Sequence, residues 1–216
     1  MTIATFENLP KIKSQYNSLA AIALLSRVFI TEDNTLDNNS TIKHWFTGQI
    51  INAFKSYEDI LILLQKHEQQ DQVKQGGLIL HYLDIPRCLE SLISIANRLC
   101  TGIKVFGKEN VRFYEFVTKY ESVIISIVKL RNDYEHFNKY LKTTQITDGE
   151  VDIIFSDSGK IIKFRKISIS TLELINFLDE LFNMICTFYP NINLENSNIN
   201  NVGNLKLSIS LDIDSK

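Results

Sequence analysis

The sequence is poor in residues that cross-link or break a chain: its 216 residues include only three cysteines and three prolines. Cys88, Cys100 and Cys186 are widely separated, and no CxxC pair occurs. This spacing argues against a disulfide framework or a thiolate metal site, because both need cysteines that come together. We interpret the three thiols as small buried hydrophobic groups in a reducing compartment.

Long apolar runs and an excess of one charge are also missing. No stretch approaches the length needed to cross a bilayer, and the first residues, MTIATFENLPK, contain no apolar core of a signal peptide. We therefore expect a cytoplasmic protein without membrane contact. Because the net charge is −2, any contact with RNA would have to come from a local basic patch.

Common catalytic motifs are absent from the sequence. It contains no P-loop, dinucleotide fingerprint, GxSxG elbow or HExxH motif. His44, His67 and His81 stand singly, without the spacing of metal ligands around them. We therefore expect neither a metal nor a cofactor.

Five helices are predicted from apolar residues that recur at alternating steps of three and four. The first is expected to begin after Asn8, with Pro10 near its first turn, and the second carries the apolar series from Phe46 to Leu64. The third is expected to begin at Asp84, a good capping residue, with Pro86 just inside it.

The fourth predicted helix has the clearest pattern. Asn110 is its expected cap, and it should run without a break to about Lys142. Nine apolar residues fall on one stripe of it: Phe113, Phe116, Tyr120, Val123, Ile127, Leu130, Tyr134, Phe137 and Leu141. The fifth helix is expected to follow a capping box formed by Ser170 and Glu173 and to stop before Pro190.

Two segments between the fourth and fifth helices favour β-structure. Residues 150–155 and 160–164 are rich in β-formers and are joined by SDSG, a hairpin signal. After an Asn-rich segment, apolar and polar residues alternate over 205–213, which predicts a strand. We therefore predict a mainly α fold: a bundle of about five helices in residues 1–190 with a β-hairpin appendage (about 150–166), followed by a tail, 191–216, with a C-terminal strand.

The sequence RNDYEH, at the end of the fourth predicted helix, contains residue types that can cleave RNA without a metal. RNA is cut when its 2′-hydroxyl attacks the adjacent phosphate. His136 could take or supply the proton, and the guanidinium of Arg131 could stabilise the charge on the phosphorane. Asn132 lies four residues before His136 and could orient its ring or bind a phosphate oxygen.

This arrangement resembles the motif of HEPN domains, in which four to six residues separate Arg from His and the first of them is Asn, Asp or His. The resemblance covers the third and fourth predicted helices and implies an all-α bundle, commonly homodimeric. Many HEPN domains are metal-independent endoribonucleases of toxin–antitoxin, phage-defence and CRISPR systems, and others are catalytically silent. One toxin branch carries Tyr two residues after the His, where this chain has Asn138.

Helix geometry bears on how such a site would be built. A separation of five residues turns a helix by about 500°, so Arg131 and His136 should point about 140° apart. We therefore expect a composite site, in which two helices meet across a two-fold axis and pair Arg131 of one protomer with His136 of the other.

Other interpretations of the same residues stay open. Arg131 and Glu135 are spaced for an ordinary ion pair along a helix, so the segment could be a solvated face of a catalytically silent interaction module that binds protein or RNA. In that case the strand at 205–213 would bind a partner, such as an antitoxin, by strand addition. A chain that is itself the antitoxin component is a third alternative.

A local basic patch is present around the second predicted β-segment. Its residues are Lys160, Lys163, Arg165 and Lys166. They surround Phe164 and could bind the phosphates of an RNA substrate. The alternative is a charged edge strand that discourages aggregation.

Overall fold

The computed structural model describes residues 9–14, 16, 40–71, 78–108, 110–137 and 151–187. The elements within them are α2 (Ser40–Asp71), α3 (Leu78–Phe106), α4 (Val111–Lys119), α5 (Glu121–Glu135), β1 (Ile154–Ser156), β2 (Ile161–Phe164), β3 (Ile167–Ser170) and α6 (Thr171–Cys186). The prediction of a mainly α fold with a small β appendage is confirmed. The tail and the strand predicted at 205–213 lie outside the described residues.

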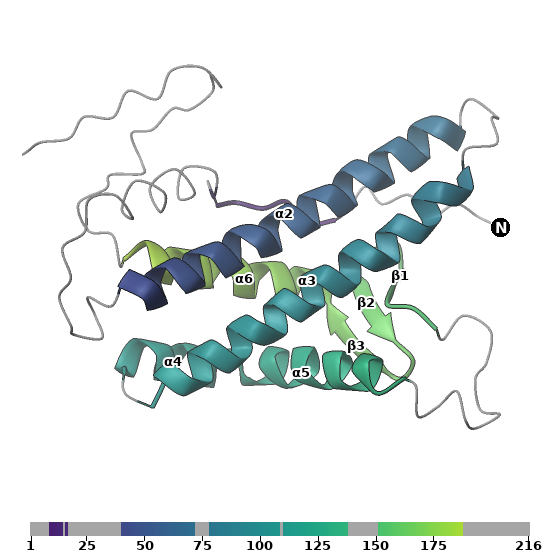
Figure 1. The fold of residues 1–216 in the computed structure, drawn as a ribbon. Helices are drawn as coiled ribbons and strands as arrows, with labels where there is room; N and C mark the ends of the chain where they lie inside the picture. The colour runs from purple at the N-terminus through teal and green to yellow at the C-terminus, as the bar shows by residue number, and fades with distance from the viewer. Residues whose placement is uncertain are drawn as a thin grey trace, which may run out of the picture.

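Helices α2 and α3 form the long axis of the molecule (Figure 1). They run antiparallel, because Trp45 near the start of α2 lies against Gly102 near the end of α3, whereas the hydroxyls of Ser56 and Ser91 approach to 3.3 Å further along the pair. The apolar residues predicted to face inward from α2 do so, and Phe46 and Tyr57 have no exposed surface.

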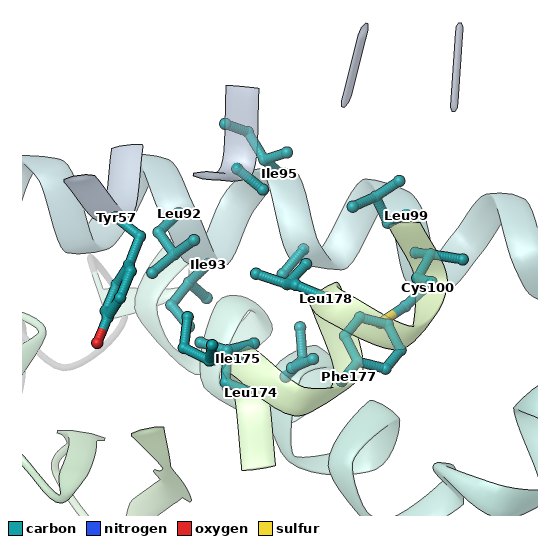
Figure 2. Close-up of a cluster of buried hydrophobic side chains, with 14 of the residues drawn as sticks. Tyr57, Leu92, Ile93, Ile95, Leu99, Cys100, Leu174, Ile175, Phe177 and Leu178 are labelled. Atoms are coloured by element: carbon teal, nitrogen blue, oxygen red, sulfur yellow. The ribbon is translucent and has the colours of Figure 1, made fainter. Parts of the chain in front are cut away.

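The core is completed by α6, which packs against α2 and α3. Figure 2 shows side chains of α3 and α6 lying among each other. Leu92 and Leu99 from α3 and Leu174, Phe177 and Leu178 from α6 have no exposed surface. Burial of this apolar area is the main favourable contribution to folding.

The long helix predicted after Asn110 is two helices, so that prediction was wrong in its boundaries. Helix α4 ends at Lys119, Tyr120 has φ −104° and ψ 21°, and α5 begins at Glu121 and ends at Glu135 rather than near Lys142. The stripe itself was predicted correctly over the described residues, and Leu141, its last member, lies outside them. Five of its residues are buried: Phe113, Phe116, Val123, Ile127 and Leu130. Tyr120, Tyr134 and Phe137 are partly buried against the core.

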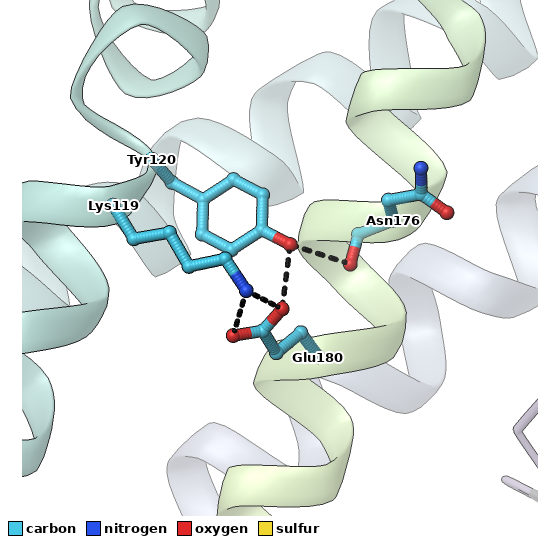
Figure 3. A network of polar contacts seen from close by, with 4 residues as sticks. All are labelled: Lys119, Tyr120, Asn176 and Glu180. Carbon is cyan, nitrogen blue, oxygen red and sulfur yellow. Dashed lines mark hydrogen bonds and ion pairs between the residues drawn. The ribbon is translucent and has the colours of Figure 1, made fainter.

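Contacts with α6 explain the break at Tyr120. Figure 3 shows the tyrosine hydroxyl donating to the carboxylate of Glu180 at 2.8 Å, while Lys119 Nζ forms an ion pair with the same carboxylate at 2.5 Å. The Tyr120 ring also lies against Phe116 and Phe177, with centroids 4.9 and 5.5 Å away. These contacts favour the bent backbone over a straight helix.

The start of α3 also differs from the prediction. The helix begins at Leu78, so Asp84 lies inside it rather than at its cap, and Pro86 is an interior residue. Leucine is a good helix former, and Leu78, Leu80 and Leu83 extend the helix upstream. A capping residue followed by proline therefore does not by itself mark the start of a helix.

The N-terminal segment is held by polar contacts instead of starting a helix at Asn8. Residues 9–13 have no regular secondary structure, which contradicts the prediction that Pro10 lies in a first helical turn. The buried carboxylate of Asp179 accepts hydrogen bonds from the Ser14 hydroxyl at 2.6 Å and from the backbone N–H groups of Lys13 and Ser14. The Pro10 carbonyl accepts a hydrogen bond from Tyr57.

The β appendage is a three-stranded antiparallel sheet in the order β1-β2-β3, one strand more than the predicted hairpin. The predicted SDSG turn is confirmed: Asp157, Ser158 and Gly159 all have positive φ. The strand that was missed, β3, follows a two-residue turn at Arg165 and Lys166. Ser170 ends β3 and, as predicted, caps α6 by accepting a hydrogen bond from the Glu173 N–H.

Two glycines inside helices provide a test of the α2–α3 packing. A Cβ at Gly102 would lie 2.7 Å from the Trp45 ring and 3.2 Å from the fully buried Phe46, whereas a Cβ at Gly48 would meet nothing within 4 Å. We expect Gly102→Ala to lower the free energy of unfolding by about 1–2 kcal/mol through overpacking. Gly48→Ala, the matched control, should raise it by about 0.5–1 kcal/mol through helix propensity.

Urea denaturation measures both changes. Trp45 is the single tryptophan of the chain, so its fluorescence spectrum should shift in Gly102→Ala and stay unchanged in Gly48→Ala. Equal stability of the two variants would contradict the close packing of Trp45 on Gly102.

Candidate functional site

The C-terminal end of α5 carries the three residues predicted to be catalytic. Arg131 and Asn132 lie in its last turn, and His136 is the C-cap, whose backbone N–H donates to the Asn132 carbonyl at 3.0 Å. Leu130, directly before them, is buried and fixes this turn on the core. The side chains of Asn132 and His136 are exposed.

Unlike Asn132 and His136, Arg131 is mostly covered. Its side chain is 19% exposed, and its guanidinium forms an ion pair with the carboxylate of Glu135, whose side chain is 47% exposed. The ion pair considered from the sequence is therefore present. It spans one turn of α5 and holds the arginine along the helix surface.

Two aromatic residues of this segment bind it to the sheet. The ring of Phe164, which has no exposed surface, lies 5.2 Å from the Tyr134 ring and 5.8 Å from the Phe137 ring between centroids, both edge to face. Figure 1 accordingly shows the strands against the C-terminal half of α5. Because Tyr134 and Phe137 flank Glu135 and His136, this contact fixes the end of the helix.

Two acidic side chains, Glu90 and Asp152, act on Tyr134. Its hydroxyl donates to Glu90 of α3 at 3.1 Å. Burial, Glu90 and the charge of Asp152 raise the pKa of Tyr134 to about 12, and the charge of Arg131 opposes them. The carboxylates of Glu90 and Asp152 therefore act on the same hydroxyl as Arg131 does, a grouping that gave no signal in the sequence.

The structure divides the four basic residues of the predicted patch. Lys163, Arg165 and Lys166 adjoin Phe164 in the chain and so lie at the end of the sheet that α5 contacts, with Lys163 on the opposite face of β2 from Phe164. Lys160 precedes β2 at the opposite end, where its carbonyl accepts a hydrogen bond from Thr171 and its Nζ lies 3.9 Å from Asp157. Lys160 is thus not brought together with the other three.

Comparison with known proteins finds no matching family model, no matching curated protein and no matching solved structure. The site is therefore interpreted from its own geometry and from the resemblance of its motif.

Other groups in the described residues give no competing site. No cluster of three or more His, Cys, Asp or Glu residues suited to a metal ion occurs among them. Burial raises the pKa of Cys186 to about 11 and that of Cys100 to about 12, so neither thiol supplies a thiolate near neutral pH. None of the described helices is both long and apolar enough to span a membrane.

Removal of the Phe164 ring tests how the end of α5 is held. We expect Phe164→Ala to cost about 3–5 kcal/mol of stability because it leaves a cavity under Tyr134 and Phe137, and Phe164→Leu to cost about 1–2 kcal/mol. Ile161→Ala, on the other face of β2 and partly exposed, should cost less than Phe164→Ala.

Hydrogen exchange of Phe164→Leu locates the effect. The His136 amide should exchange faster than in the wild-type protein, whereas amides in the middle of α2 should lose protection only in proportion to global stability. Unchanged relative protection of His136 would show that Phe164 does not hold the helix end.

Proposed function

We propose that this chain is a metal-independent endoribonuclease of the HEPN type that acts in a toxin–antitoxin or phage-defence setting. The observation that carries the proposal is the contact of Phe164 with Tyr134 and Phe137, which brings an arginine, an exposed histidine and a basic turn to one end of the molecule. Together they provide a proton-transfer group, a guanidinium and cationic partners for phosphate.

Each residue has a role in cleavage by the 2′-hydroxyl. His136 transfers a proton to or from the reacting oxygens, for which an imidazole side chain in an exposed position is suitable. Arg131 stabilises the charge that develops on the phosphate, and Asn132 binds a phosphate oxygen or orients the histidine. Lys163, Arg165 and Lys166 bind the flanking RNA backbone.

The site is completed by a second copy of the chain. One stripe of α5, opposite its buried side, consists of exposed residues at steps of three and four: Ser122, Ile125, Lys129, Asn132 and His136. An isologous contact along such a stripe pairs the helices of two protomers about a two-fold axis. Arg131 lies to the side of this stripe, about 140° from His136 on its own helix, so we place His136 of one protomer beside Arg131 of its partner at the edge of this contact.

A catalytically silent interaction module is the second candidate, and one observation favours it. The ion pair between Arg131 and Glu135 gives the arginine a partner within its own helix, so no substrate is needed to explain its charge. In that case partner binding should depend on residues 191–216 and be indifferent to His136.

Substitution of the two main residues tests the enzyme. We expect His136→Ala and Arg131→Ala each to reduce RNA cleavage at least about 100-fold, because the first removes proton transfer and the second removes charge stabilisation. Lys55→Ala, an exposed change on α2, should leave the rate unchanged. The assay measures cleavage of single-stranded and structured RNA in the presence of EDTA and identifies 2′,3′-cyclic phosphate ends.

Thermal unfolding should show all three variants within about 1 kcal/mol of the wild-type protein. Absence of cleavage by the wild-type protein, or equal cleavage by every variant, would overturn the ribonuclease and favour the interaction module.

Mixing the two inactive variants tests the composite site. After Arg131→Ala and His136→Ala protomers are unfolded and refolded together, half of the dimers are mixed, and each mixed dimer holds one intact pair. We therefore expect about a quarter of the wild-type activity to return. No recovery, although mixed dimers are detected by mass, would place both residues of the site in one protomer.

A further inference from the structure

The direct partner of Arg131 is the carboxylate of Glu135, one helical turn away. Only 19% of the Arg131 side chain is exposed, so little of the guanidinium is open to another anion while Glu135 remains in contact with it. A phosphate that binds Arg131 through two parallel hydrogen bonds needs the same N–H groups. Glu135 and an RNA phosphate therefore compete for one cation.

The two carboxylates that act on the neighbouring Tyr134 hydroxyl are placed differently. Glu90 accepts a hydrogen bond from the Tyr134 hydroxyl, and both Glu90 and Asp152 are half-buried. Glu135 is 47% exposed, so water can solvate its carboxylate once the ion pair opens. Glu135 is thus the acidic residue whose carboxylate a phosphate can displace from Arg131.

The balance between the two anions favours exchange. An ion pair along one helix whose carboxylate is open to solvent is weak, because water and salt screen it and two flexible side chains must be held in place. A paired phosphate contact of arginine is stronger, and the turn at Arg165 and Lys166, which follows Phe164 at the same end of the molecule, adds positive charge there.

We propose that Glu135 is a positioning residue that an RNA phosphate displaces from Arg131, so that its negative charge sets the affinity of the site for RNA. This inference rests on the proposed function. Removal of the charge should tighten RNA binding by about 3- to 10-fold, the range expected for one like-charge repulsion at a partly exposed site. This gain in RNA affinity requires the Arg131 guanidinium.

The experiment uses Glu135→Gln, which keeps the size of the side chain and removes its charge. Glu121→Gln is the matched control, since Glu121 is an exposed glutamate on the same helix, 14 positions away. Fluorescence anisotropy measures the binding of a labelled, single-stranded 2′-O-methyl oligonucleotide, which lacks the attacking hydroxyl. Arg131→Ala and the double variant Arg131→Ala/Glu135→Gln complete the set.

Glu135→Gln should bind about 3- to 10-fold more tightly than the wild-type protein, and Glu121→Gln should stay within twofold of it. The double variant should bind no better than Arg131→Ala. In cleavage assays Glu135→Gln should lower KM with kcat unchanged, because the charge opposes the bound substrate and the transition state alike.

Equal or weaker binding by Glu135→Gln overturns the inference, and so does a gain that persists in the double variant. If the wild-type protein cleaves RNA but KM is the same in Glu135→Gln, the ribonuclease stands and only the role of Glu135 falls. If the wild-type protein neither binds nor cleaves RNA, both proposals fall together.

Discussion

The contact of Phe164 with Tyr134 and Phe137 is the interaction on which the rest of the candidate site depends. It joins a strand to a helix end that is remote from it in the sequence, and it leaves Glu135 and His136 between two fixed rings. The basic turn follows Phe164 directly and so comes to the same end of the molecule. Without this contact the helix end and the basic turn would be two unrelated surface features.

Local physics made part of the fold predictable. The buried stripe through Phe113, Phe116 and Val123 is set by helical periodicity, and the cap at Ser170 is set by residues three positions apart. The break at Tyr120 has another origin, since the Glu180 carboxylate that binds its hydroxyl lies 60 positions away in the chain. No local pattern contains that information, because a continuous apolar stripe is compatible with a straight helix and with a bent one.

The turns and the site also combine features set by the local sequence with features set by contacts between distant residues. SDSG was predictable because glycine accepts positive φ without strain, whereas Arg165 has φ 54° because the pairing of Phe164 with Ile167 leaves a two-residue turn. At the site, the sequence was sufficient to predict the spacing of Arg131, Asn132 and His136 on one helix end. It could not predict that Glu90 and Asp152 lie near the Tyr134 hydroxyl, because those contacts arise only when α3 and the chain before β1 pack together.

The ion pair between Arg131 and Glu135 distinguishes the two candidate functions more sharply than any other contact. An i,i+4 pair on a helix surface contributes only about 0.3–0.5 kcal/mol, so folding does not depend on it. The end of α5 is held instead by Leu130 in the core and by the Phe164 contact. Arg131 and Glu135 can therefore exchange partners without loss of the fold. In an interaction module the pair simply persists, whereas in a ribonuclease it opens each time a phosphate binds.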